Sequence, residues 1–140
     1  MSIAISMEKI NNPPSYRIFV FGSNLAGRHG KGAALHAARY YGAQPDISIG
    51  LAGQCYAIPT KDQMLRPLRL EQVQHFVGRF VAYANSNPQL HFNVIRVGCG
   101  YAGFRDDQIA PLFARASDNC WFDIQWKPWL PNKKFWEKRP

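Results

Sequence analysis

The sequence has few of the features expected of a secreted, metal-binding or membrane-spanning protein. It contains only three cysteines, Cys55, Cys99 and Cys120, and no CxxC pair. An odd number of widely spaced cysteines argues against a disulfide framework and against a zinc site. No apolar run reaches the length of a membrane span, and the N-terminus lacks the basic flank and apolar stretch of a signal peptide. We therefore expect a cytoplasmic protein with no membrane partner and no resident metal or cofactor.

Acidic residues are also scarce. The chain has 17 Lys and Arg against 9 Asp and Glu, a net charge of +8, and half of this surplus lies in the last 14 residues. One interpretation of the segment Lys127–Arg139 is an arm that binds nucleic acid, because bases stack on aromatic rings and phosphates attract lysine and arginine. The other is an extension whose aromatic residues pack on the domain while its charges face water. Both interpretations remain open from the sequence.

The length and apolar content fit one globular domain. Its 140 residues are 46% apolar, enough to build a core. We divide the chain into a lead-in (1–15), a domain (16–126) and a basic aromatic tail (127–140). Alternating and helical patterns within the domain predict four strands and three helices, with 42–53 as loop. The strands are 16–21, 54–58, 91–97 and 120–126, and the helices are 32–41, 70–86 and 107–117. This alternation predicts an α/β fold with a mostly parallel sheet between helices.

Two glycine-rich segments follow predicted strands and precede predicted helices. The first is Gly22–Gly32 and the second Gly98–Phe104. Glycine frees the backbone, and N–H groups at such junctions bind anions. Together with Pro59–Asp62 they fall at the carboxyl edge of the sheet, where ligands bind in parallel α/β folds. The candidate ligand-binding residues are Gly22, Ser23, Asn24, Gly30, Lys31, Gly32, Ala33, Gly98, Cys99, Gly100, Tyr101, Ala102, Gly103 and Phe104.

Neither segment fits a standard nucleotide motif. Gly98–Gly103 matches G-x-G-x-x-G, but too little chain follows it to build the second half of a Rossmann fold. The first segment has Leu25 where a P-loop requires glycine, and no Ser or Thr follows Lys31. A Rossmann enzyme and a P-loop NTPase are both disfavoured.

Three polar residues are candidates for catalysis: Asn24, Asp62 and Asp106. An amide at the end of the first strand can hold a sugar hydroxyl or a water, but it can equally stabilise its own loop. Asp106 and its neighbour Asp107 also lie where a helix N-terminus favours carboxylates, and capping is the preferred interpretation of both.

Cys99 is a candidate nucleophile, because free backbone N–H groups near a helix start lower the pKa of a thiol. It would require His29 or His36 as its base. The preferred interpretation is that Cys99 is a small residue filling a tight turn.

The two glycine segments resemble the ligand loops of macro domains. Phe21–Ala34 is similar to the first loop, where Asn-Ala-Ala-Asn precedes glycines and a helix, and Gly98–Phe104 is similar to the second, Ser-Thr-Gly-x-x-Gly-Phe. The chain is most similar to small, divergent macro-like proteins of bacteria and phages. The resemblance covers roughly 16–126, and implies a three-layer α/β/α module that binds ADP-ribose.

The resemblance also implies roles for particular residues. Asn24 would approach the distal ribose, while Gly30–Ala33 and Gly100–Phe104 would hold the diphosphate. Tyr101 or Phe104 would flank the sugar. We expect binding of ADP-ribose or a related nucleotide, with ADP-ribosyl hydrolysis as the reaction of an active enzyme. The alternatives are a nucleic-acid-associated protein acting through its tail and a cysteine-dependent hydrolase.

Overall fold

A computed structural model describes residues 17–43 and 47–137, and the expected lead-in lies outside these ranges. The sheet has six strands in the order β2-β3-β1-β4-β5-β6. β1 pairs in parallel with β3 on one side and with β4 on the other. β4 pairs in parallel with β5, and β5 with β6, whereas β2 is antiparallel to β3. In chain order the strands and α-helices are β1 (Ile18–Asn24), α2 (Gly32–Tyr40), β2 (Gly50–Ala52), β3 (Cys55–Lys61), α3 (Leu70–Ser86), β4 (Phe92–Val94), α4 (Asp106–Ile109), β5 (Cys120–Asp123) and β6 (Lys134–Trp136). The α/β class and the mostly parallel sheet are confirmed.

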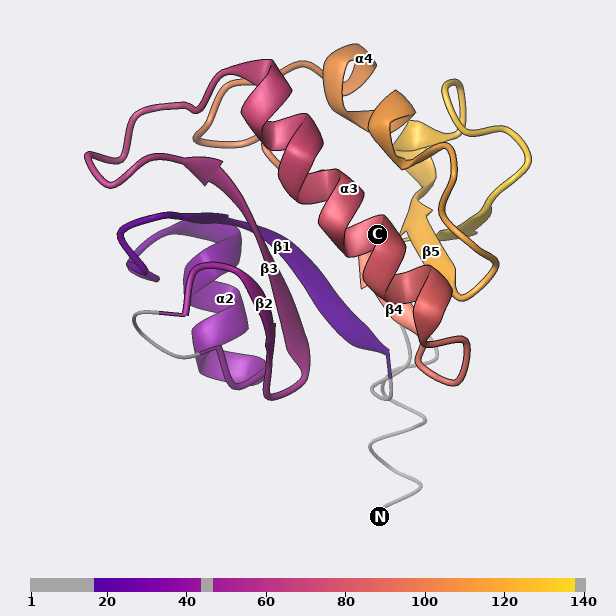
Figure 1. Cartoon of the computed structure of the whole chain (residues 1–140), viewed down its shortest axis with the longest axis horizontal. Helices are drawn as coiled ribbons and strands as arrows, with labels where there is room; N and C mark the ends of the chain where they lie inside the picture. Colours follow the sequence, from indigo (N-terminus) through magenta and orange to yellow (C-terminus); the bar gives the residue numbers. More distant parts are fainter. Residues whose placement is uncertain (1–16, 44–46, 138–140) are drawn as a thin grey trace.

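Helices cover both faces of this sheet, which gives three layers. Along β1, Ile18 and Val20 belong to the hydrophobic cluster beneath α3, whereas Phe19 and Phe21 belong to the cluster beneath α2. Successive side chains of a strand point to opposite faces, so one strand serves two cores. Figure 1 shows α3 crossing the sheet on one side and α2 on the other.

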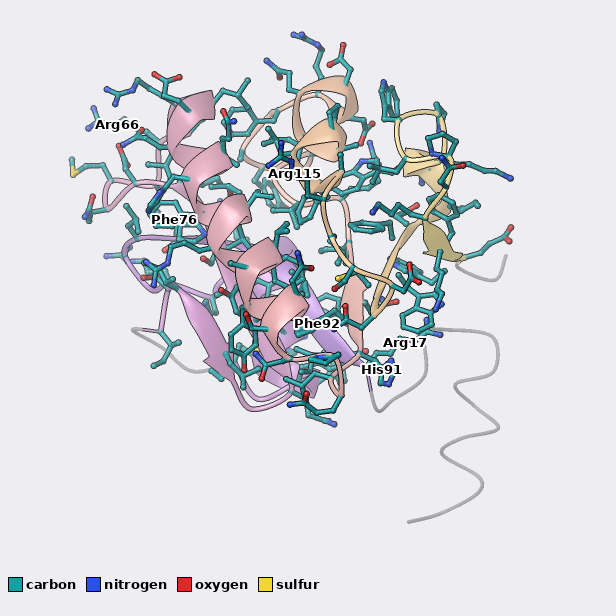
Figure 2. The ribbon with its side chains drawn as sticks, turned by 45° about the vertical axis from the view of Figure 1, so that its right-hand side comes forward. Arg17, Arg66, Phe76, His91, Phe92 and Arg115 are labelled. Atoms are coloured by element: carbon teal, nitrogen blue, oxygen red, sulfur yellow. The ribbon has the colours of Figure 1, made fainter. Side chains whose placement is uncertain are left out.

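The longest helix, α3, forms where its apolar stripe predicts. Val73, Val77, Phe80 and Ala84 recur at helical spacing and are fully buried. The Phe80 ring meets Phe92 of β4 edge to face, with ring centroids 5.1 Å apart, and Figure 2 shows Phe92 beneath this helix. This packing fixes α3 across the middle of the sheet.

Three predicted elements are shorter than expected. The helix predicted over 107–117 is a single α-turn, α4, followed by a 3-10 helix, Ala110–Phe113, that contains Pro111. Proline has no N–H for an α-helical hydrogen bond, and the chain tightens there. The strand predicted over 91–97 ends at Val94, and the one over 120–126 ends at Asp123 before a second 3-10 helix, Ile124–Trp126.

Both edge strands lie where no strand was predicted. β2 occupies part of the expected loop 42–53, and β6 lies in the segment interpreted as a tail. The Phe135 side chain packs against the core cluster under α3, and the Trp136 indole N–H donates to the Val94 carbonyl at 2.9 Å. Each strand has three residues, too few for an alternation of apolar and polar residues to be recognised in the sequence. None of the helices within the described ranges is long and apolar enough to cross a membrane.

Candidate functional site

A cavity of about 870 Å³ opens at the carboxyl ends of β1 and β3, where the two glycine segments meet. The segments contact each other at their backbones: a Cβ on Gly22 would lie 3.2 Å from the Gly98 nitrogen. The wall is made of Gly22, Ser23, Asn24, Arg28, Gly30, Lys31, Gly32, Ala33, Ala34, Thr60, Lys61, Leu65, Ile95, Arg96, Val97, Gly98, Cys99, Gly100, Tyr101 and Ala102.

The first segment is folded by its own asparagine. The Asn24 amide donates to the Arg28 carbonyl at 2.8 Å, and its oxygen accepts from the Arg28 N–H at 2.9 Å. Asn24 therefore borders the cavity with both side-chain polar atoms engaged in closing its own turn. This is the loop-stabilising arrangement considered from the sequence.

The second segment is closed by backbone hydrogen bonds. The Phe104 N–H donates to the Gly98 carbonyl at 2.9 Å, and the Gly103 N–H donates to Gly100 at 3.0 Å. Gly98 has φ +77°, and a Cβ there would lie 3.2 Å from the Phe104 ring. Glycine is required at this position both by the left-handed backbone and by the ring.

Tyr101 lies at the mouth of the cavity, with 69% of its surface exposed. The Lys31 and Lys61 nitrogens lie 5.8 Å and 5.4 Å from the centre of its ring. The ring also reaches the first segment: a Cβ on Gly32 would come within 2.8 Å of it, and Gly32 itself has φ +53°. Phe104, the other residue expected to flank a sugar, packs against the core and is not part of the wall.

The cavity wall is cationic. Arg28, Lys31 and Lys61 make no ion pair with a carboxylate within the described residues, and the described wall contains no Asp or Glu. Among the residues that the structure describes, Arg96 is the one basic wall residue with an acidic partner, Asp106. Such a wall favours an anionic ligand.

Asp106 is held away from the cavity by protein donors. Its carboxylate accepts two hydrogen bonds from Arg96, at 2.8 Å and 2.7 Å, and one from the Trp126 indole at 2.7 Å. Arg96 foremost, together with Trp126, lowers the pKa of Asp106 to about 2. The carboxylate therefore anchors α4 and is not part of the cavity wall.

The Asp62 carboxylate is also engaged by hydrogen bonds, in this case from nearby backbone groups. It accepts from the N–H groups of Met64 and Arg66 at 2.8 Å and 2.9 Å. The hydrogen bond from the Arg66 N–H is the main reason that the pKa of Asp62 lies below its usual range. The resulting turn places Leu65, with φ +62°, in the cavity wall while Asp62 stays outside it.

Cys99 borders the cavity as a protonated thiol. Burial, followed by the charge of Asp106, raises the pKa of Cys99 to about 12. Neither His29 nor His36 is in the wall. Neither of the bases expected for the thiol therefore borders the cavity beside it, in contrast to a cysteine-dependent hydrolase.

All the sequence-predicted ligand residues except Gly103 and Phe104 are in the wall. The wall residues absent from the predicted set include Thr60, Lys61 and Leu65, which come from the end of β3 and the turn after it. The sequence pointed to Thr60 and Lys61 through the segment Pro59–Asp62, which was expected at the same sheet edge, but gave no such indication for Leu65. Across the described ranges, no group of three or more His, Cys, Asp or Glu side chains could hold a metal.

Comparisons with known proteins find similarity in structure alone. The sequence matches no protein-family model and no curated protein. The macrodomain of Mycobacterium tuberculosis DarG superposes with a TM-score of 0.58 at 17% identity, over 90% of this chain and 91% of that one.

Two further solved structures are similar. Thermosipho africanus DarTG in complex with ADP-ribose gives a TM-score of 0.55 at 14% identity, over 79% of this chain and 39% of that one. A Bacteroides thetaiotaomicron protein of unknown function gives 0.51 at 16% identity, over 72% and 81%. At these identities the likeness is one of fold.

Proposed function

The chain has the macrodomain fold, and on that premise we propose that its cavity binds ADP-ribose. The observation that carries the proposal is the meeting of two glycine segments at one cationic cavity. Backbone N–H groups and the Arg28, Lys31 and Lys61 side chains can neutralise a diphosphate there. One structure with this fold, that of Thermosipho africanus DarTG, is described as a complex with ADP-ribose.

A second candidate function, hydrolysis of ADP-ribosyl bonds, is favoured by the position of Lys61. This lysine is partly buried in the wall at the end of β3, and it makes no ion pair within the described part of the chain. In such a hydrolysis water attacks the ribosyl carbon as its bond to the leaving group breaks, and an ammonium group can donate the proton that the leaving group takes. We therefore propose Lys61, in place of Asp62 and Asp106, as the residue that assists cleavage.

Calorimetric titration with ADP-ribose tests the binding proposal, with NAD and AMP as comparators. We expect saturable binding of ADP-ribose that is tighter than binding of either comparator. The informative variant is Gly100→Val. A Cβ at Gly100 meets no protein atom within 4 Å, so the protein should fold normally while the side chain obstructs the ligand. Affinity should fall at least about tenfold, since a clash must displace the ligand or the loop.

Gly78→Val is the matched control. Gly78 lies in α3, outside the cavity wall, and a Cβ there also meets no atom within 4 Å. The same substitution should leave ADP-ribose binding unchanged. Gly32→Val is less informative, because it would strain a left-handed residue and collide with Tyr101. No binding by the wild type, or normal binding by Gly100→Val, would refute the proposed site.

A separate assay tests the role of Lys61 in hydrolysis. Lys61→Met should abolish release of ADP-ribose from an ADP-ribosylated substrate while retaining at least part of the affinity for free ADP-ribose. Asp62→Asn, whose side chain lies outside the wall, should keep the activity. Loss of activity in Asp62→Asn alone would assign the reaction to the carboxylate.

A further inference from the structure

The arrangement around Tyr101 joins three segments that are far apart in the sequence. Its ring comes from the second glycine segment, Lys31 precedes α2, and Lys61 ends β3. The ring leans on Gly32, where any Cβ would collide with it. A side chain with 69% of its surface exposed would ordinarily sample several rotamers. Here the two ammonium groups, both within 6 Å of the ring centre, favour one position.

The two lysines also have a competing partner when the site is filled. An ammonium group binds a phosphate oxygen through a charge-assisted hydrogen bond, which is stronger than its attraction to an exposed aromatic ring. Lys31 and Lys61 cannot hold the ring and a bound diphosphate equally well. The occupied and empty cavities should therefore differ in the position of Tyr101.

We propose that Tyr101, Lys31 and Lys61 form a latch that narrows the mouth of the cavity in the free protein. An anion releases the latch by drawing both ammonium groups off the ring. The proposal rests on the proposed function, in that the anion is the diphosphate of ADP-ribose. A latched free state lowers the apparent affinity in proportion to the fraction of molecules that are unlatched.

This proposal predicts the direction of the kinetic change when the ring is removed. Tyr101→Leu should raise the association rate constant of ADP-ribose and tighten its Kd, both by about fivefold, with an unchanged dissociation rate. Tyr101→Phe retains a ring and should keep the slow association of the wild type. Tyr40→Leu is the matched control, because Tyr40 is also 68% exposed but lies in α2, outside the wall.

Stopped-flow binding decides between a latch and a stacking platform. A ring that stacked on the ligand would give the opposite result: Tyr101→Leu would dissociate faster and bind more weakly. That result, or rates in Tyr101→Leu equal to those of wild type, would overturn the proposal.

A second measurement needs no ADP-ribose. Protons above an aromatic ring are shifted upfield, so the side-chain ε-methylene signals of Lys31 and Lys61 should be shifted upfield in the NMR spectrum of the free protein. The shift should be absent in Tyr101→Leu and should disappear on titration with inorganic pyrophosphate. If the free protein shows no shift, or pyrophosphate binds without removing it, the latch is refuted even where ADP-ribose binds. If ADP-ribose fails to bind, the proposed function is refuted, and the lysine shifts still decide whether the ring and lysines are associated.

Discussion

At the scale of single residues, the carboxylate of Asp106 has an unusual concentration of donors. Arg96 and Trp126 together donate three hydrogen bonds to it, and they join the turn before the second glycine segment to the 3-10 helix after β5. A partly buried, doubly bonded arginine–carboxylate pair contributes more than an exposed one, because less of its interaction is screened by water. Asp106 is thus a structural anchor for the segment that ends at Phe104.

The depressed pKa of Asp106 makes the stability of the protein depend on pH. Its pKa falls from 3.8 to about 2 on folding, so its contribution is complete above the unfolded value and is lost as pH falls through the folded one. The wild type should lose roughly 2 kcal/mol of unfolding free energy through this group between pH 4 and pH 2. Asp106→Asn should lack that part of the loss and be less stable at pH 7. Urea unfolding of the wild type and of Asp106→Asn between pH 2 and pH 7 measures this difference in unfolding free energy.

Asp107→Asn is the control for this experiment. Asp107 pairs with Arg105, and the two side chains are 52% and 71% exposed, so the substitution should change stability little at pH 7. Equal acid sensitivity of Asp106→Asn and wild type would contradict the anchoring role.

At the scale of elements, predictability follows the range of the interactions that form each one. The apolar stripe of α3 is a local pattern, and the structure places that helix at Leu70–Ser86, as predicted. The glycine segments were likewise found from local chemistry. β6 forms because it pairs with the exposed edge of β5. A segment of three residues contains no local pattern that would reveal this pairing. The sequence places Pro59–Asp62 at the ligand edge of the sheet, but it does not show that Lys61 reaches the cavity wall, because that depends on β3 pairing directly beside β1.

The edge strand β6 provides a test of this long-range contribution. Trp136→Phe keeps most of the ring but removes the N–H that donates to the Val94 carbonyl, and should lower the free energy of unfolding by about 1 kcal/mol. Trp129→Phe is the control, because Trp129 is 39% exposed and should tolerate the change within about 0.5 kcal/mol. Chemical denaturation of both variants gives the comparison. An equal effect of the two substitutions would mean that the Trp136 hydrogen bond adds nothing to the sheet.

At the scale of the whole molecule, the distribution of the net charge of +8 distinguishes ligand binding in the cavity from nucleic-acid binding by the C-terminal segment. All four ion pairs found in the described residues involve arginine, and their acidic partners are Asp62, Glu71, Asp106 and Asp107. The cavity lysines are left to act on a ligand. In the segment interpreted as a basic arm, Lys133 donates to the Ala116 carbonyl and Lys134 lies over the Trp121 ring. These two lysines are tied to the domain surface.

This distribution leads to a prediction about salt. Exposed charges attract across about 10 Å at 0.1 M salt and much less at higher concentrations. Lys31→Gln should weaken ADP-ribose binding about threefold at 50 mM salt and less at 500 mM, since one exposed charge contributes up to roughly 1 kcal/mol and its attraction to phosphate exceeds its attraction to the Tyr101 ring. Arg79→Gln, on the exposed side of α3 and outside the wall, should have no effect at either concentration. Calorimetry at both concentrations provides the measurement.

Binding of a short RNA by the same variants separates the cavity from the nucleic-acid alternative. A site in the cavity predicts that RNA binds weakly and that Lys127→Gln leaves ADP-ribose affinity unchanged. Lys127 is the suitable position because it is exposed and lies outside the wall. Deletion of 127–140 would also remove β6 and disturb the sheet. Tight, salt-sensitive RNA binding that Lys127→Gln weakens and Lys31→Gln does not would place the physiological anion on the C-terminal surface, because only charges near the bound phosphates can change its affinity.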